Sequence, residues 1–223
     1  MPEVNEQNIA ADLVRIHRCL TRGIAVTQEK SQSFGLGGLP DQAARKGFAC
    51  FVRSLVTVLD VHHSLEDSMF FPYMEKLIPD APYGALATDH QTFASILPEM
   101  EAAVAETENG GDHSAAMNEL NDAAGRLSEL WHPHIAIEEH HFNVPKLGKL
   151  LPPEEHVRLE GLVSEHNLKH AKPDYLVVPF ILFNLAGPDR QEMAKEFPPI
   201  VTEQLIPVAW KDQWAPMKPF LLP

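Results

Sequence analysis

Cysteine is scarce in this sequence, with two residues, Cys19 and Cys50, among 223. Two cysteines in apolar surroundings do not make a disulfide framework, so we expect buried, reduced thiols in a cytoplasmic protein. Long apolar runs are also missing. The longest covers residues 176–183, far short of the ~20 residues that a membrane-spanning helix requires. The opening stretch, MPEVNEQNIA, has neither the basic nor the apolar segment of a signal peptide, so we expect none.

Positive charge is in the minority. Lys and Arg number 18 against 31 Asp and Glu, which gives a formal net charge of −13 at pH 7. Such a chain has little with which to neutralise phosphates or lipid headgroups, so we expect no nucleic-acid partner and no membrane partner. The hydrophobic fraction of 44% is that of an ordinary globular protein and argues against disorder.

Strand patterns are nearly absent, and apolar residues recur instead at spacings of three and four. Five apolar residues in the first such stretch illustrate the pattern: Ile9, Leu13, Ile16, Leu20 and Ile24. The pattern predicts an all-α fold, with an antiparallel up-down four-helix bundle in residues 1–150. The four helices are expected at residues 5–27, 40–71, 85–106 and 114–143.

The composition changes after Leu151. Residues 151–223 are rich in proline and apolar side chains, with helical patterns near 154–171, 176–185 and 189–196. So apolar a tail is not a disordered linker. We therefore expect a C-terminal helical, Pro-rich extension that packs on the bundle, closes one of its ends and controls access to its interior.

A glycine-rich stretch, SQSFGLGGL, occupies residues 31–39. A phosphate-binding P-loop needs a Lys-Ser/Thr pair at the start of a helix that follows a strand, and neither feature is present here. We therefore expect a plain loop between the first two helices.

Histidine is abundant, with 12 residues. Each predicted bundle helix places one histidine on its apolar stripe: His17, His62, His90 and His134. Glu66 and Glu138 follow two of these by one helical turn, and His63 continues the adjacent inward row. A single histidine on an apolar face is usually a satisfied core residue. Burying this many polar groups without partners would cost several kcal/mol, whereas a shared metal site satisfies them together.

The segments HHSLEDSMFFP at residues 62–72, DHQ around His90, and HIAIEEHHFNVP at 134–145 resemble the hemerythrin-like, HHE-type cation-binding family. The resemblance covers roughly residues 8–150. It implies a four-helix bundle with two irons, bridged by two carboxylates and an oxo or hydroxo group (Fe–O–Fe or Fe–OH–Fe), with manganese or zinc as substitutes. Carried over, the family's ligands correspond to His17, His62, Glu66, His90, His134 and Glu138.

The sequence departs from the classical oxygen carriers at two positions. Those proteins have a second histidine four residues after the third-helix histidine, where this chain has Ala94, and an aspartate five residues after the last-helix histidine, where this chain has Glu138 at four. His63 is the natural replacement for the missing ligand. Five histidines, two bridging carboxylates and a bridging oxygen then leave about one open position on two six-coordinate ions.

Several polar residues near this set keep alternative interpretations. Glu139 competes with Glu138 as the bridging carboxylate, although its position, about 100° further round the helix, favours a solvated acid, and the same holds for Asp67. His141 lies on the inward row beyond Glu138. His166 either lies partly exposed near the C-terminus of a helix or faces the metal site or its access channel from the extension.

Two functions from different classes fit this site. The first is a binding protein: an O₂ carrier, a sensor of O₂, peroxide or another small ligand, or an iron-handling protein. The second is an enzyme, a diiron oxidase, oxygenase or peroxidase, whose small organic substrate is held under the extension. Aromatic residues there would wall such a pocket: Phe180, Phe183, Trp210, Trp214 and Phe220. A structural metal site without redox work is the third interpretation.

Overall fold

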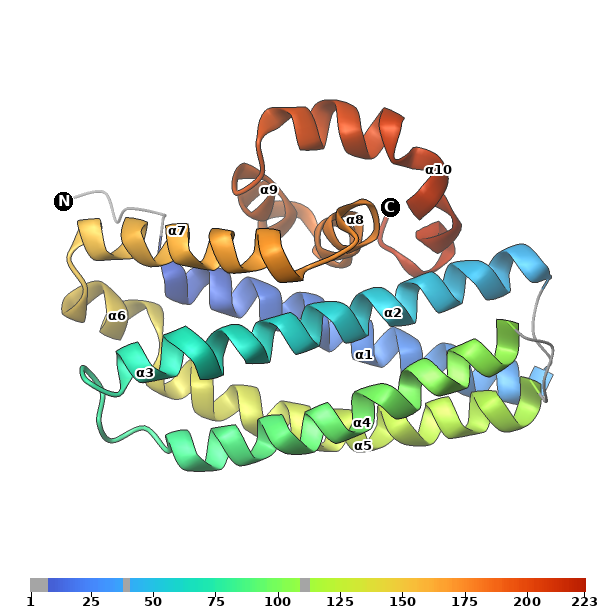
Figure 1. The fold of residues 1–223 in the computed structure, drawn as a ribbon, viewed down its shortest axis with the longest axis horizontal. Coiled ribbons are helices and arrows are strands. Elements are labelled where there is room, and N and C mark those ends of the chain that lie inside the picture. Colours follow the sequence, from blue (N-terminus) through green and yellow to red (C-terminus); the bar gives the residue numbers. More distant parts are fainter. Residues whose placement is uncertain (1–7, 38–40, 109–112) are drawn as a thin grey trace.

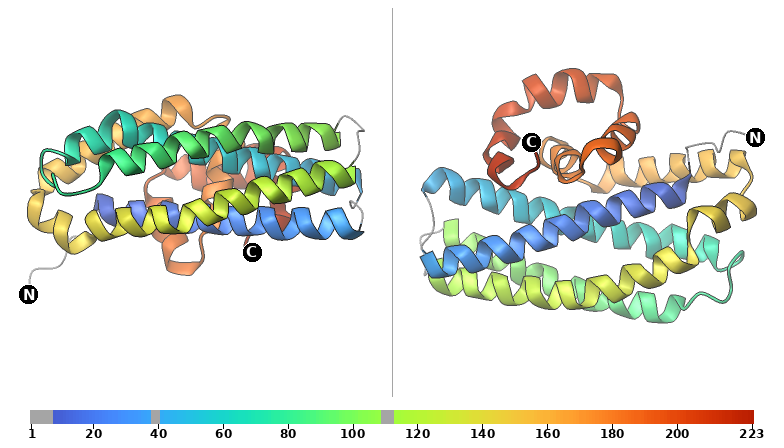
Figure 2. Two further views of the ribbon diagram at one scale, coloured as in Figure 1. Left: turned by 90° about the horizontal axis from the view of Figure 1, so that it is seen from below. Right: turned by 180° about the vertical axis from the view of Figure 1, so that it is seen from behind.

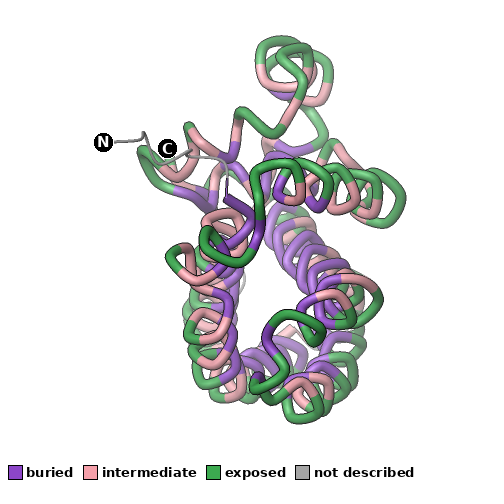
Figure 3. Tube along the Cα trace, turned by 90° about the vertical axis from the view of Figure 1, so that its left-hand side faces the viewer, coloured by how far each residue is buried: buried purple, intermediate pink, exposed green. Residues whose placement is uncertain are grey.

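The fold is an all-α bundle, as the sequence predicts. The computed structural model describes residues 8–37, 41–108 and 113–223, and every regular element in these ranges is helical. Four long helices form the bundle, and successive ones run in opposite directions (Figure 1): α1 (Ile9–Gly37), α2 (Gln42–Leu65), α4 (Tyr83–Glu108) and α5 (His113–His141). Seen along its axis, the bundle is a ring of four helices whose buried faces point inward (Figure 3).

The apolar stripes that predict the helices form the interior of this ring. Leu20, Phe51, Phe93 and Leu127 each come from a different helix and are fully buried in one core cluster. Trp131 is the largest fully buried side chain and lies in the same cluster. Each large apolar side chain buried in this way contributes about 1.5–3 kcal/mol, so the packed stripes hold the four helices at fixed registers.

The first helix is longer than the sequence predicts. α1 continues through Ser31 to Gly37, across most of the segment expected to be a loop, and residues 38–40 lie outside the described ranges. The cause is tertiary packing. The Phe34 ring lies edge-on to Phe48, 5.3 Å away, and also contacts Phe220 from the C-terminal end of the chain. These contacts outweigh the low helix propensity of the glycines.

The second predicted helix contains a wide turn. After α2 the chain forms a π-helical turn, η1 (Glu66–Phe70), and then the short α3 (Phe71–Met74). Here the Phe71 N–H bonds to the Glu66 carbonyl, five residues back. Pro72 explains the irregularity, because it has no N–H and its ring would clash with the carbonyl four residues earlier in a regular α-helix. π-turns of this kind occur often at functional sites.

Residues 153–223 pack against one side of the bundle, formed by α1 and α2, and do not close an end of it, whereas α6 connects them to the end of α5 (Figures 1 and 2). α7 lies beside α1 and α2, and α8 and η3 pack on α2. On this side, Phe180 stacks edge-on against Phe51 with ring centroids 5.1 Å apart. The expectation of an end cap is therefore wrong. The elements are α6 (Val144–Leu150), α7 (Pro153–His170), α8 (Asp174–Asn184), α9 (Gly187–Lys195), η2 (Val201–Ala209), α10 (Lys211–Trp214) and η3 (Ala215–Phe220).

The sequence also predicts buried, reduced thiols and no membrane-spanning helix. Both cysteines are free; Cys19 is buried, whereas Cys50 is only partly so. Within the described ranges, none of the helices combines the length and the apolar character needed to cross a bilayer.

The contact between α2 and η3 yields a prediction. A Cβ atom at Gly47 would overlap the backbone carbonyl of Pro216, so Gly47→Ala must displace η3. We expect a loss of about 1–3 kcal/mol in the free energy of unfolding, measured by urea denaturation. Gly161→Ala is the control, because nothing lies within 4 Å of that position in α7, and it should be neutral or stabilise by up to ~1 kcal/mol. Equal stability of the two variants would contradict the close packing.

Candidate metal centre

The seven residues that the sequence singles out as ligands all lie inside the bundle, and every one of them is buried. They come from all four long helices and the π-turn: His17 from α1, His62 and His63 from α2, Glu66 from η1, His90 from α4, and His134 and Glu138 from α5. Two groups of four could each hold an ion, because within each group the ligand atoms lie within 4.8 Å of one another.

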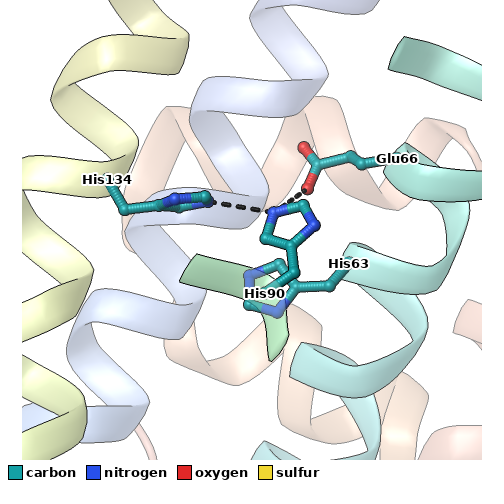
Figure 4. Close-up of side chains that lie close together, drawn as sticks. All are labelled: His63, Glu66, His90 and His134. Atoms are coloured by element: carbon teal, nitrogen blue, oxygen red, sulfur yellow. Dashed lines mark hydrogen bonds and ion pairs between the residues drawn. The ribbon is translucent and has the colours of Figure 1, made fainter. Parts of the chain in front are cut away.

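The first group consists of His63, Glu66, His90 and His134 (Figure 4). The Nε2 atoms of His90 and His134 are 3.1 Å apart. The same His90 atom is 3.6 Å from Glu66 Oε2. Neighbouring donors around an octahedral ion, each about 2.1 Å from it, are separated by roughly 3 Å, so this spacing fits ligands of one ion.

The second group consists of His17, His62, Glu66 and Glu138. His17 Nε2 is 3.2 Å from Glu138 Oε2, and His62 Nε2 is 3.5 Å from Glu66 Oε2. Glu66 therefore belongs to both groups. Glu138 also reaches across, because its other oxygen, Oε1, is 3.4 Å from His134 Nε2 in the first group. Both carboxylates thus lie between the two groups, where bridging ligands would lie.

The donor atoms of this centre are short of hydrogen bonds. Among the described residues, the buried atoms without a hydrogen-bond partner include Nε2 of His17, His62 and His63 and both carboxylate oxygens of Glu66 and Glu138. Buried polar atoms are normally paired, and leaving so many unpaired is costly. Imidazole nitrogens and carboxylate oxygens are also the ligands that iron and similar ions take. The residues present therefore fit a metal centre.

The electrostatics of the centre point the same way. Burial lowers the pKa of His62 and His63, and the neighbouring histidines lower it further, which favours the neutral rings that bind a metal. Burial and the charge of Glu138 raise the pKa of Glu66. Burial also acts to raise the pKa of Glu138, but the contacts with His134 and His17 outweigh it and lower that pKa below its usual value.

Three further carboxylates hold the outer nitrogens of the histidines. Glu139 Oε1 is 2.9 Å from His17 Nδ1. In the same way, Asp67 Oδ1 is 2.8 Å from His90 Nδ1, and Asp89 Oδ2 is 3.2 Å from His134 Nδ1. A carboxylate on Nδ1 fixes the tautomer that leaves Nε2 free for a metal and makes that nitrogen more basic.

No pattern in the sequence directly indicates these three roles. It favours solvated acids for Glu139 and Asp67, and Asp89 is not singled out at all. One signal could have found them, since each acid is the immediate sequence neighbour of a predicted ligand: Glu139 of Glu138, Asp67 of Glu66, and Asp89 of His90. One residue along a helix is a turn of about 100°, which aims such an acid at the histidine of a neighbouring helix. In the structure Glu139 lies outside both groups, whereas Glu138 lies within one.

Aromatic side chains enclose the centre. Trp131 meets the His17 ring edge-on at 5.6 Å, Phe93 stacks on His63 at 4.7 Å, and Phe71 stacks on His90 at 5.4 Å. These rings keep water away from the donor atoms and hold the imidazoles in place.

The remaining histidines lie elsewhere. His166 Nε2 is 3.0 Å from the hydroxyl oxygen of Ser64, on the outer side of α2. His141 belongs to neither ligand group, and the same is true of His166. The alternative that His166 faces the metal site from the extension is therefore not what the structure shows.

The positioning acids can be tested. We expect Glu139→Gln to weaken metal binding about 10- to 100-fold, measured by competition with a chelator, because the amide supports the imidazole less well than the carboxylate does. Glu129→Gln, at an exposed position of the same helix, removes the same charge and should leave the affinity unchanged. If both variants lose affinity equally, the effect is one of net charge and Glu139 does not position His17.

Comparison with known families identifies the family to which this site belongs. The family model described as the hemerythrin HHE cation-binding domain matches residues 8–144, more than half of the 223-residue chain. The matched range contains both ligand groups. Comparisons with curated proteins and with solved structures found no match. The family match confirms the resemblance carried by the histidine motifs: the chain belongs to the hemerythrin HHE cation-binding family and is a metal-binding helical protein.

Proposed function

We propose that this protein is a non-heme diiron protein that binds O₂ or a related small ligand, as a carrier, a sensor or an iron-handling protein. The observation that carries the proposal is the pair of ligand groups joined by Glu66 and Glu138. Two irons held by these residues would supply the redox chemistry that reaction with O₂ or peroxide needs. Five imidazoles and two carboxylates suit this role.

The two groups differ in their supply of imidazoles, and this difference supports a ligand-binding role. Three histidines, His63, His90 and His134, belong to the first group, but only His17 and His62 belong to the second. With Glu66 and Glu138 both acting as bridges, the ion on the His63 side would have five protein ligands and the ion on the His17–His62 side only four. An open coordination position on that side is where a small ligand would bind.

A second candidate function, the oxidation of a small organic molecule with O₂ or peroxide as the oxidant, is favoured by a cavity beside the centre. The cavity has a volume of about 470 Å³ and lies between α1, α2 and the extension. Its lining includes His62, from the group with fewer imidazoles, and Glu66, which belongs to both groups. A carrier of O₂ does not need a space of this size, whereas cavities of 300–1,000 Å³ are typical for organic ligands.

The dinuclear character predicts a metal ratio. Protein purified in the presence of iron should contain about two irons per chain, measured by elemental analysis against protein concentration. A reproducible ratio of one would overturn the diiron proposal.

His63 provides the matched test of the ligand set. His63→Ala removes an imidazole from the first group only, so we expect one ion to be lost at a lower chelator concentration than the other. His132→Ala, at an exposed position of α5, should release both ions as the unaltered protein does. If His63→Ala binds both ions normally, His63 is a neighbour of the centre and not a ligand.

Access through the cavity predicts a kinetic effect. Val163 lines the cavity from α7, so Val163→Trp should obstruct the route to the His62 side and slow azide binding to the iron-loaded protein several-fold in stopped-flow absorbance. Val157→Trp places the same ring on the same helix at a position that is 60% exposed, and it should leave the rate unchanged. Equal rates for all three proteins would show that small ligands enter by another path.

A further inference from the structure

The cavity beside the metal centre has mostly apolar walls. One side of the cavity is formed by α1 and α2, and the other by α7, α8, α9, the turn between α9 and η2, the first residue of η2, and Trp210 directly after η2. Ile16, Val61, Val163, Val178, Ile181 and Trp210 are among the lining side chains. One water molecule occupies about 30 Å³ in the liquid, so a volume of about 470 Å³ corresponds to roughly fifteen non-hydrogen atoms. The ligand that fits is thus a small organic molecule with a hydrocarbon body.

The charges that line this cavity are all of one sign. Its lining contains five acids, Asp12, Glu66, Glu160, Asp174 and Glu196, and no lysine or arginine. Three of the five have a function or a partner. Glu66 belongs to the metal centre, Asp12 pairs with Arg15 at 2.5 Å, and Asp174 pairs with Lys172 at 2.8 Å.

Glu160 and Glu196 carry the remaining charge. Glu160 Oε1 is buried and has no hydrogen-bond partner. Glu160 lies in α7 and Glu196 in the turn directly after α9, and both interact electrostatically with Asp12 on α1. Two helices and this turn thus bring carboxylates together at one part of an apolar cavity.

The pKa values reflect this arrangement. Burial raises the pKa of Glu160, and the charges of Asp12 and Glu196 raise it further. Burial and Asp12 likewise raise the pKa of Glu196, while Arg15 acts in the opposite direction. A bound cation would relieve this repulsion, whereas a bound anion would add to it.

We propose that the cavity binds a hydrophobic organic amine, with its ammonium group between Glu160 and Glu196 and its hydrocarbon body directed toward His62 and Glu66. An alkyl ammonium ion matches both features of the cavity, because carboxylates form charge-assisted hydrogen bonds with the head and apolar walls take the chain. The role of this amine as a substrate rests on the second candidate function above. Its binding does not, because none of the groups that hold the ammonium is a metal ligand.

Calorimetric titration of the purified, metal-containing protein tests the proposal with three probes of matched length: n-decylamine, 1-decanol and decanoate. We expect decylamine to bind at least about tenfold more tightly than decanol, and decanoate to bind most weakly. Val163→Trp should weaken decylamine binding, because it fills the cavity, whereas Val157→Trp should not. Preference for decanoate, equal binding of the three probes, or no binding would overturn the proposal.

The carboxylates are tested by a double substitution. Glu160→Gln with Glu196→Gln should reduce decylamine affinity about tenfold or more and leave decanol affinity unchanged. Glu154→Gln with Glu165→Gln is the control, because it removes two charges from exposed positions of α7 outside the cavity. If both pairs weaken decylamine equally, the preference comes from net charge and the proposed site is wrong.

This outcome is separable from that of the diiron proposal. Two irons per chain without amine binding would leave the diiron proposal intact and overturn this one. Amine binding that depends on Glu160 and Glu196 in a chain with one ion would do the reverse.

Discussion

The structure depends on the cost of burying charged and polar ligands in the middle of an apolar bundle. Five imidazoles and two carboxylates meet there, and most of their inward-facing atoms have no hydrogen-bond partner. A metal centre offsets that cost, because it binds the donor atoms that the protein leaves unpaired. The close packing of the helices above and below supplies the rigidity that keeps the donors within reach of one another. Trp131, fully buried against His17, illustrates how tightly the centre is enclosed.

A second layer of interactions fixes the direction of three of the candidate ligands. Glu139, Asp67 and Asp89 hold the outer nitrogens of three histidines, each across a helix–helix boundary. The π-turn serves the same end from the backbone, because it begins at Glu66, the carboxylate shared by both ligand groups. These carboxylate–histidine contacts join neighbouring helices and also orient the candidate ligands, so a shift of one helix would disturb both the packing and the ligand geometry.

The two sides of the bundle are not equivalent. The side of α4 and α5 contributes His90 and His134 to the group with three imidazoles. On the side of α1 and α2, the ligand group has only two imidazoles, and the extension covers that side without filling the space beneath it. The side with fewer ligands therefore adjoins the cavity. The packing of the C-terminal third of the chain therefore decides which of the two ligand groups a molecule in the cavity can reach. The acids that line the cavity favour a positively charged molecule there.

The sequence by itself determined the helical class of the fold and the inward position of the candidate ligands, because both follow from a local rule. The 3.6-residue period places apolar residues, together with His17, His62, His90, His134 and the glutamates one turn later, on inward faces. It could not determine what depends on partners far along the chain. α1 continues through its glycines because Phe34 packs on Phe220, and Glu139 reaches His17 from another helix. The extension lies on the α1–α2 side and not over an end because Phe180 packs on Phe51. Only the tertiary structure decides such contacts, since no local period encodes which distant surfaces meet.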